Sequence, residues 1–200
     1  MNIFVKDSQI NIAVFCSGSG SNAQKIFEYF RDRKDVNIVA TMCNKKDAYA
    51  LERAKKFNIP TRVFNKEEFA HSDVIVNELK ALKTDWVILA GFLWLIPDRL
   101  LEAFPGKIIN IHPALLPAYG GKGMYGMYVH QAVLDAKEKQ TGITVHYINE
   151  NYDEGEIIFQ AACDIGDCYS PEMVAKKVQS LEHQHYPRII DELITQSIKG

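Results

Sequence analysis

The first 112 residues alternate short runs of consecutive apolar residues with segments in which apolar residues recur every three or four positions. Continuous apolar runs are typical of strands buried on both faces, and the longer recurrence is typical of a helix that buries one face. The sequence predicts strands at residues 10–16, 36–43, 61–64, 86–92 and 107–112. It predicts helices between them at residues 21–33, 47–57 and 67–82.

Strands that alternate with helices build right-handed strand–helix–strand units on a parallel sheet. Because these strands are apolar on both faces, we expect helices to cover both faces of the sheet. The predicted architecture is doubly wound α/β.

The pattern changes after residue 117. A stretch rich in glycine, methionine and tyrosine, residues 118–128, cannot hold one regular element throughout. The sequence then predicts a helix at 129–139, an antiparallel strand pair at 142–150 and 156–165, and a long helix from 171 to about 197. The sheet is therefore expected to be mostly parallel, with an antiparallel pair at its C-terminal end.

The composition is that of an ordinary globular protein of 200 residues, with 47% hydrophobic residues, 24% charged residues and a net charge of −2. This charge does not favour a nucleic acid as partner. No apolar run approaches the roughly 18 residues that span a bilayer, and no export signal is recognisable. We expect a cytoplasmic protein. The four cysteines lack the spacing of metal ligands, so no metal is expected.

Ligands of open parallel sheets bind outside the carboxyl ends of the strands, so the loops that follow the strands are candidate binding loops. The glycine loop, Ser-Gly-Ser-Gly-Ser-Asn at 17–22, joins a strand to a helix and can turn backbone N–H groups toward a phosphate. The third glycine of a dinucleotide fingerprint is missing, because Ala23 follows Asn22, and this argues against a nicotinamide cofactor. From the loop alone, a tight turn without a ligand is the alternative.

Asn110 and His112 lie at the end of the fifth predicted strand. Residues two apart on a strand project to the same face, so we expect the amide and the imidazole to point into one pocket and to donate to one developing oxyanion. A packed histidine beside a structural asparagine is the alternative. Pro113 and Pro117 are expected to stiffen the following loop and to permit a cis bond.

Asp153 lies in the loop between the two antiparallel strands. A carboxylate near a catalytic imidazole favours the charged form of that imidazole and holds its orientation. Taken alone, an Asp in an Asp-Glu-Gly turn is more often only a turn residue. No serine or cysteine stands in a Gly-x-Ser-x-Gly setting, so we expect positioning and proton transfer rather than a covalent intermediate.

These motifs, in this order, resemble the phosphoribosylglycinamide formyltransferase family, folate-dependent enzymes of purine synthesis, over nearly the full length of the chain. The resemblance rests on SGSGSN at 17–22, LAGF at 89–92, NIHPALLP at 110–117, GITVHY at 142–147 and YDEGEIIFQ at 152–160. The glycine loop is a weak motif by itself, whereas NIHP-x-LLP is a strong one.

The resemblance implies one domain over residues 1–200 with the formyltransferase fold. Its halves would be a mononucleotide-binding half at about 9–112 and a folate-binding and catalytic half at about 113–200. The implied reaction moves the formyl group of 10-formyltetrahydrofolate, a co-substrate, to the amine of 5-phosphoribosylglycinamide. No metal is implied, and the resemblance leaves open whether the protein is a monomer or a homodimer.

The resemblance also assigns roles to individual residues of this sequence. The catalytic residues would be Asn110, His112 and Asp153. The ribonucleotide would be bound by Gly20, Ser21, Asn22, Lys66, Gly91 and Glu182, with the first three at its phosphate and Glu182 at its ribose. The folate would be bound by Leu93, Trp94, Leu95, Ile96, Ile148, Glu150 and Asn151.

The sequence departs from the family pattern at three places. Trp94 stands where many relatives have an arginine, so apolar stacking is expected to replace contacts to the folate tail. Lys66 replaces an arginine that often assists phosphate binding, and a lysine lacks its bidentate geometry. The glycine-rich segment at 118–128 is longer than usual, which suggests a mobile flap or ordinary loop variation.

Three other functions fit parts of this pattern. A formyltetrahydrofolate hydrolase would carry a further N-terminal domain, and a methionyl-tRNA formyltransferase would carry a C-terminal domain and a basic face for RNA. We expect neither, because only about nine residues precede the first predicted strand and the chain ends soon after its long helix. A binding module that has lost catalysis would lack one of the three catalytic residues, and all three are present.

Overall fold

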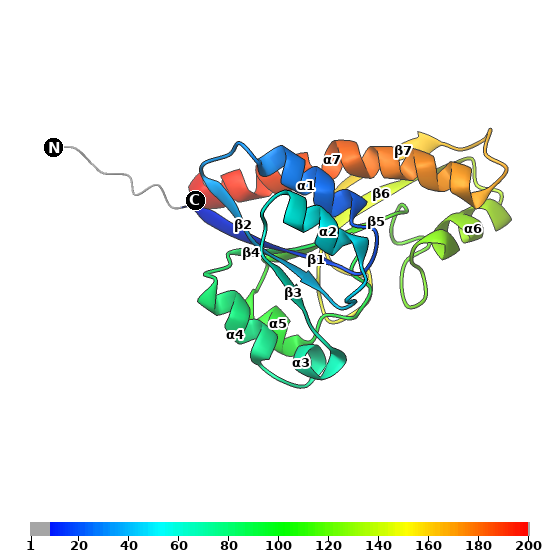
Figure 1. The fold of residues 1–200 in the computed structure, drawn as a ribbon. Coiled ribbons are helices and arrows are strands. Elements are labelled where there is room, and N and C mark those ends of the chain that lie inside the picture. Colours follow the sequence, from blue (N-terminus) through cyan, green and yellow to red (C-terminus); the bar gives the residue numbers. More distant parts are fainter. Residues whose placement is uncertain (1–8, 200) are drawn as a thin grey trace.

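The computed structural model describes residues 9–199, which are arranged around one seven-stranded sheet with the order β3-β2-β1-β4-β5-β6-β7 (Figure 1). The strands are β1 (Ile10–Cys16), β2 (Val36–Cys43), β3 (Thr61–Val63), β4 (Trp86–Leu89), β5 (Ile108–His112), β6 (Gln140–Tyr147) and β7 (Ile157–Asp164). The first five are parallel to one another, and β6 runs antiparallel to both β5 and β7. The predicted architecture is therefore confirmed.

Helices cover both faces of the sheet, with α1, α2 and the long α7 on one side and α3, α4 and α5 on the other (Figure 1). Their bounds are α1 (Ser21–Phe30), α2 (Tyr49–Lys56), α3 (Lys66–Ala70), α4 (Val74–Ala81), α5 (Asp98–Ala103), α6 (Met127–Asp135) and α7 (Pro171–Lys199). None of the helices in residues 9–199 is long and apolar enough to cross a membrane.

The strand order reverses next to β1, which pairs with β2 on one side and with β4 on the other. The connections that leave β1 and β4 therefore run in opposite directions, and this opens a crevice at the carboxyl ends of these strands. The two loops at this point are tied together, because the Ser17 amide donates to the Gly91 carbonyl over 3.1 Å and the Leu93 amide donates to the Ser17 hydroxyl over 3.2 Å.

Two hydrophobic clusters fill the space between the sheet and the two helix layers. In the first cluster, Tyr186 of α7 is fully buried, and its hydroxyl donates to the carbonyl of Leu89 at the end of β4 over 2.8 Å. The second cluster contains a group of aromatic rings around Phe15, which lies 5.5 Å from Phe92 and 5.8 Å from Phe64 between ring centres. Both clusters fix the carboxyl ends of the strands that border the crevice.

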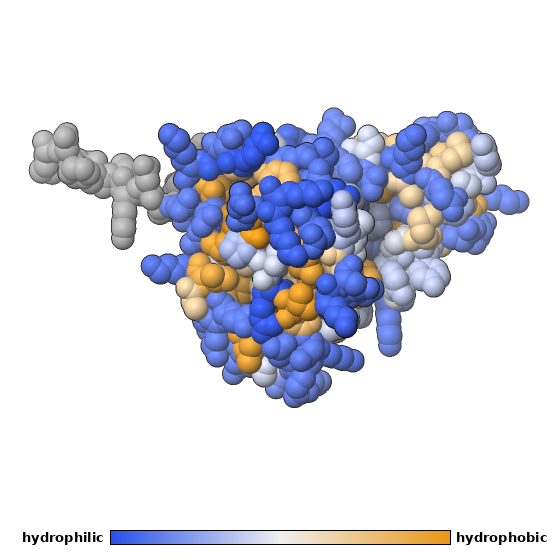
Figure 2. Space-filling model, viewed as in Figure 1, coloured by the Kyte–Doolittle hydropathy of each residue, from blue (hydrophilic) through white to orange (hydrophobic). Residues whose placement is uncertain are grey.

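Polar side chains cover most of the face that contains β3, and hydrophobic ones gather near its middle, between α2 and α4 (Figure 2). Val63 of β3 and Val74 of α4 are among the exposed apolar residues of the structure. β3 is one of the two edge strands of the sheet and has only three residues, which limits the unpaired backbone that it offers to another chain.

Several element boundaries differ from those predicted. The helix predicted at 67–82 is two helices, since Ser72 donates its hydroxyl to the Glu68 carbonyl over 2.9 Å and competes with the helical backbone. The strand predicted at 86–92 ends at Leu89, before Gly91 takes a left-handed conformation with φ of 76°. α5 was not predicted, because it is too short to show a clear period.

Replacing Tyr186 with Phe tests how firmly α7 holds the end of β4. The substitution removes the buried hydroxyl that reaches Leu89, so we expect the free energy of unfolding in urea to fall by about 1–3 kcal/mol. Tyr29→Phe is the matched control, because the Tyr29 hydroxyl also bonds a partner, Asp191, but its side chain is 43% exposed. We expect this control to lose less than about 0.5 kcal/mol. Equal losses in the two variants would contradict the account.

Candidate active site

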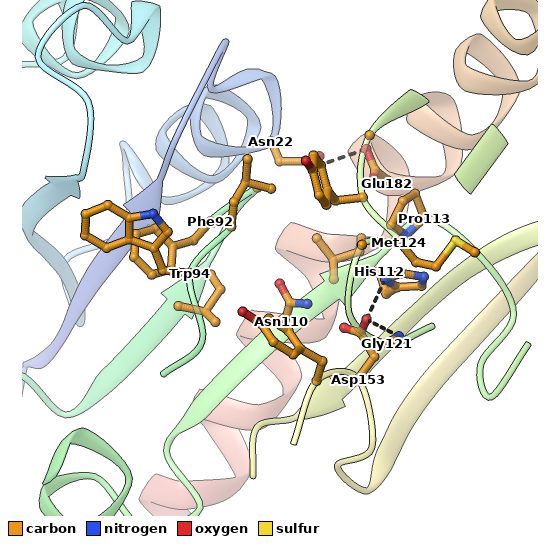
Figure 3. Close-up of a pocket in the computed structure, with 18 of the residues that line it drawn as sticks. Asn22, Phe92, Trp94, Asn110, His112, Pro113, Gly121, Met124, Asp153 and Glu182 are labelled. Atoms are coloured by element: carbon orange, nitrogen blue, oxygen red, sulfur yellow. Dashed lines mark hydrogen bonds and ion pairs between the residues drawn. The ribbon is translucent and has the colours of Figure 1, made fainter. Parts of the chain in front are cut away.

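A cavity of about 590 Å³ lies at the carboxyl ends of β1, β4 and β5 (Figure 3). This volume is within the range of small-molecule sites. Its walls come from segments far apart in the sequence: the glycine loop, the loop after β4, the end of β5, the glycine-rich segment, the loop after β6, and α7. The sheet topology thus gathers at one place the loops that the sequence identified as candidate binding loops.

The glycine loop is held by α2. Gly20 has φ of 70°, and a Cβ at this position would lie 2.5 Å from the Cβ of Ala50, so both the backbone conformation and the packing require glycine. The Ala50 amide also donates to the Gly18 carbonyl over 3.1 Å. Ser19 and Asn22 line the cavity, whereas Gly20 and Ser21 shape the loop behind its wall.

Asn22 and Glu182 meet at one end of the cavity, where the Asn22 amide nitrogen donates to the Glu182 carboxylate over 3.0 Å (Figure 3). The other amide atom, Oδ1 of Asn22, is buried and has no hydrogen-bond partner among the described residues. Burial raises the pKa of Glu182 to about 7, although the Asn22 hydrogen bond acts in the opposite direction. This end of the cavity therefore presents an unpaired acceptor and a carboxyl group that exchanges its proton near neutral pH.

Asn110 and His112 lie on the same face of β5 and both line the cavity. His112 is 3% exposed, and its Nε2 lies 2.8 Å from the carbonyl oxygen of Tyr119. A carbonyl only accepts, so Nε2 carries a hydrogen. The other ring nitrogen, Nδ1, is the one that faces Asp153, 3.5 Å from its Oδ2 (Figure 3).

Asp153 reaches the two β5 residues from the loop between β6 and β7. Its backbone is left-handed, with φ of 57°, and its Oδ2 accepts a hydrogen bond from the Gly121 amide over 3.0 Å. Gly155 allows the loop to turn this closely, because a Cβ there would lie 1.7 Å from the Tyr147 carbonyl oxygen. The short Asp-Glu-Gly sequence thus aims one carboxylate at His112.

Burial lowers the pKa of His112, while the Asp153 carboxylate and the Tyr119 hydrogen bond act against this shift. The resting imidazole is therefore neutral over a wider pH range than an exposed one. A proton that arrives at Nδ1 would still be stabilised by the neighbouring carboxylate. A ring that is neutral at rest and has a carboxylate beside it is suited to accept a proton and return it within one reaction.

The segment after β4 forms the apolar wall of the cavity. Leu93, Trp94, Leu95 and Ile96 line it from one side, and Ile148 and Asn151 line it from the loop after β6. The Trp94 ring belongs to the aromatic group of the core, 5.8 Å from Phe69 and 6.2 Å from Phe92 between ring centres. Glu150 and Lys66, two of the predicted binding residues, do not line this cavity, whereas Gly91 does.

The glycine-rich segment borders the cavity opposite the apolar wall. Residues 121–126 line it, and three of its glycines, Gly121, Gly123 and Gly126, have positive φ angles. Lys122 brings a positive charge to this border. The structure thus places the segment beside the site.

Two histidines that sequence reasoning assigned no role lie close to the predicted residues. His146 is opposite Asn110 in the pairing of β5 with β6, and its Nε2 lies 3.3 Å from the Asn110 amide nitrogen. His130 of α6 lines the cavity with a buried Nδ1 that has no partner among the described residues. The alternation in Gly-Ile-Thr-Val-His-Tyr indicates that His146 shares a face with Thr144, but only the strand register places it at Asn110.

Residues 9–199 contain no group of three or more His, Cys, Asp or Glu side chains placed to hold a metal ion. The chemical groups of the site include the Asn110 amide as a hydrogen-bond donor, the buried His112 imidazole and the Asp153 carboxylate. Together they are able to stabilise a developing oxyanion and to move a proton.

Comparison with known proteins agrees with this geometry. The sequence profile of a family described as formyl transferase matches residues 10–190. A chloroplastic phosphoribosylglycinamide formyltransferase of Arabidopsis thaliana is 43% identical over 94% of the chain, which spans 66% of that relative's length. The phosphoribosylglycinamide formyltransferase of Bacillus subtilis is 37% identical over 94% of the chain and 96% of its own length.

Solved structures give the same result. The glycinamide ribonucleotide transformylase 1 of Symbiobacterium toebii superposes with a TM-score of 0.84 at 32% identity, over 95% of this chain and 90% of the other. Both the sequence and the fold are therefore shared with relatives of this name, and the chain belongs to the formyl transferase family.

Proposed function

We propose that this protein transfers the formyl group of 10-formyltetrahydrofolate to the amine of 5-phosphoribosylglycinamide, as the names of its relatives suggest. The observation that carries the proposal is the convergence of Asn110, His112 and Asp153 at one cavity beside a glycine loop. The transfer is direct, since these groups position substrates and move protons but supply no nucleophile of their own. The reaction serves purine synthesis in the cytoplasm.

In the proposed reaction, the amine nitrogen attacks the formyl carbon and the formyl oxygen becomes an oxyanion. The Asn110 amide donates to this oxyanion, and the Nδ1 of His112 donates to it once this nitrogen has received a proton. A single well-placed donor of this kind is worth about 2.7–4 kcal/mol in comparable enzymes. The bond from the formyl carbon to the folate nitrogen then breaks, and the carbonyl forms again.

The attacking amine must lose one proton, and the departing folate nitrogen must gain one. Asp153 and the neighbouring His112 lie where they can carry this proton, through a water, between the two nitrogens. Because Asp153 is already fixed by the Gly121 amide, its carboxylate does not have to reorganise during the transfer. The proton that the amine loses is the one that the folate nitrogen gains, so the reaction needs no other co-reactant.

The ribonucleotide is proposed to lie along the glycine loop and α7. Its phosphate would meet backbone N–H groups at the start of α1, where the helix dipole favours an anion. Its ribose would lie between Asn22 and Glu182, whose unpaired acceptor and carboxyl group suit sugar hydroxyls. Lys66 begins α3 outside the cavity wall and would act on the phosphate only at a distance.

The folate is proposed to bind between the wall at 93–96 and the loop that contains Ile148 and Asn151. Trp94 would stack on the aromatic part of its tail, because this residue lines the cavity and its ring is held by the aromatic group of the core. Glu150 would contact the folate only if the loop after β6 moves, since it is exposed and does not line the cavity in this structure.

The activity is tested by mixing the protein with 10-formyltetrahydrofolate and following the folate product by absorbance, with and without 5-phosphoribosylglycinamide. We expect turnover only when the ribonucleotide is present. Turnover without it, with release of formate, would indicate a hydrolase instead. Binding of both compounds without turnover would indicate a module that has lost catalysis.

Substitutions at the catalytic residues should act on the rate rather than on binding. We expect His112→Ala and Asp153→Asn each to lower kcat by about 10²–10⁴-fold, because each removes a proton-carrying group. The dissociation constant of the ribonucleotide, measured by titration calorimetry, should change less than about threefold. Equal losses in kcat and in affinity would show that Asp153 only shapes its loop.

Gly20→Ala tests the glycine loop. The alanine must take a left-handed backbone at a cost of roughly 1–2 kcal/mol, and its Cβ would press on Ala50, so the N–H groups that face the phosphate should shift. We expect KM for the ribonucleotide to rise about tenfold. Gly18→Ala is the matched control, since a Cβ at Gly18 meets no atom within 4 Å. If both variants bind the ribonucleotide equally well, the glycine loop does not bind its phosphate as proposed.

Glu182→Gln tests the buried carboxyl group. The pKa of Glu182 is about 7 in the folded protein against an ordinary value of 4.5, so its favourable contribution to stability is present below pH 4.5 and is lost as pH rises through 7. Glutamine does not titrate. The free energy of unfolding of the variant, relative to that of the wild type, should therefore rise by about 1–3 kcal/mol between pH 4.5 and pH 8, measured by urea unfolding.

The control for this measurement is Glu192→Gln, which changes an exposed carboxylate on the same helix. We expect its stability relative to the wild type to depend far less on pH. If the free energy of unfolding of Glu182→Gln depended on pH in the same way as that of the wild type, the Glu182 carboxyl group would not be desolvated. This result would contradict the structure.

A further inference from the structure

His146 is a fully buried residue of β6 that does not line the cavity, yet one of its ring nitrogens contacts two residues of the site. Its Nδ1 lies 2.9 Å from the carbonyl oxygen of Tyr147. Its Nε2 lies 3.3 Å from the amide nitrogen of Asn110 and 3.7 Å from Oδ1 of Asp153. The mechanism described above uses none of these contacts.

The hydrogen-bond partners determine which nitrogen of His146 carries the proton. The Tyr147 carbonyl only accepts, so the hydrogen is on Nδ1, and in the neutral ring Nε2 is left with a lone pair that accepts. The amide atom of Asn110 that faces this lone pair must then be the nitrogen. The chain of donors runs from Asn110 to His146 to Tyr147.

The hydrogen bonds from Asn110 to His146 and from His146 to Tyr147 fix the orientation of the Asn110 amide. Its amide nitrogen has two hydrogens, and one of them is held by His146. The second hydrogen remains for a group in the cavity, and the nitrogen cannot exchange places with the oxygen without losing the bond to His146. We propose that His146 is a positioning residue, which keeps the Asn110 amide turned so that its N–H donates to the oxyanion of the formyl transfer.

The inference rests on the proposed function for its catalytic meaning, but the hydrogen-bond chain is a property of the free protein. His112 differs from His146 in this respect, because its hydrogen is on Nε2, toward Tyr119. Asp153 lies between the two rings, with one oxygen toward each. The structure thus assigns opposite tautomers to two histidines that share one carboxylate.

The neutral state of His146 is required for this arrangement. A proton on Nε2 would turn the acceptor into a donor, which would favour the Asn110 oxygen over its nitrogen and draw the ring toward Asp153. The charged or titratable groups that face His146 are Asp153, from the loop after β6, and His112, from β5. Burial lowers the pKa of His146 and keeps the ring neutral near pH 7, against the effects of Tyr147 and Asp153.

The tautomers are measured by ¹⁵N NMR of the histidine rings in the whole protein without substrates. We expect His146 to carry its hydrogen on Nδ1 and His112 to carry its hydrogen on Nε2. A hydrogen on Nε2 of His146 would overturn the proposal, whatever the activity of the protein. If the tautomers are as expected and no formyl transfer occurs, the proposed function fails while the hydrogen-bond chain stands.

The catalytic role is tested with His146→Phe, which keeps a ring of similar size but removes the acceptor, and with His146→Gln, which can place an oxygen near the position of Nε2. We expect His146→Phe to lower kcat by about 10–100-fold with KM for both substrates little changed, because the oxyanion donor is no longer held. His146→Gln should recover most of the rate. His71→Phe, at an exposed histidine outside the cavity, is the control and should leave the rate unchanged.

A double-mutant cycle separates positioning from a general effect on the structure. If His146 acts through Asn110, then His146→Phe should cost less than about twofold when it is added to Asn110→Ala. A loss as large as in the wild-type background would overturn the proposal. Loss of the rate in His146→Gln together with an intact fold, measured by circular dichroism, would also overturn it.

Discussion

The antiparallel pairing of β6 with β5 is the constraint on which the site depends. It places His146 opposite Asn110 and Thr144 opposite His112, so that the face of β5 that borders the cavity is supported by polar residues of its neighbour. Thr144 accepts from the Leu116 amide over 3.0 Å and donates to the Ala114 carbonyl over 2.7 Å, which fixes the loop after β5. A shift of this pairing by one residue would turn these side chains to the other face of the sheet.

The remaining parts of the site are held to this strand pair from both sides. The loop after β6 returns Asp153 to His112, and the glycine-rich segment supplies the Gly121 amide that fixes the carboxylate. On the other side, the glycine loop follows β1 in the parallel part of the sheet and packs against α2. At Gly20 this loop has a left-handed backbone that only glycine adopts without strain. The parallel strands and the antiparallel strand pair thus both contribute loops to one cavity.

Much of this arrangement could be predicted from the sequence, because it depends on local patterns. The apolar runs gave the parallel strands, and the spacing of Asn110 and His112 placed both on one face of β5. The contribution of His146 could not be predicted in this way, since it depends on the register between two strands that are about thirty residues apart. The tautomer of His112 could not be predicted from the sequence either, because it depends on the hydrogen bond to the Tyr119 carbonyl. Lys66 and Glu150 were assigned by resemblance alone, and they lie outside the cavity wall.

The central claim is that these residues join a formyl carbon to a glycinamide nitrogen. The most direct measurement uses 10-formyltetrahydrofolate labelled with ¹³C in the formyl group and 5-phosphoribosylglycinamide labelled with ¹⁵N in its amine. The account predicts an NMR signal of an amide carbon that is coupled to the labelled nitrogen. Appearance of the ¹³C label only as free formate, or its retention on the folate, would contradict it.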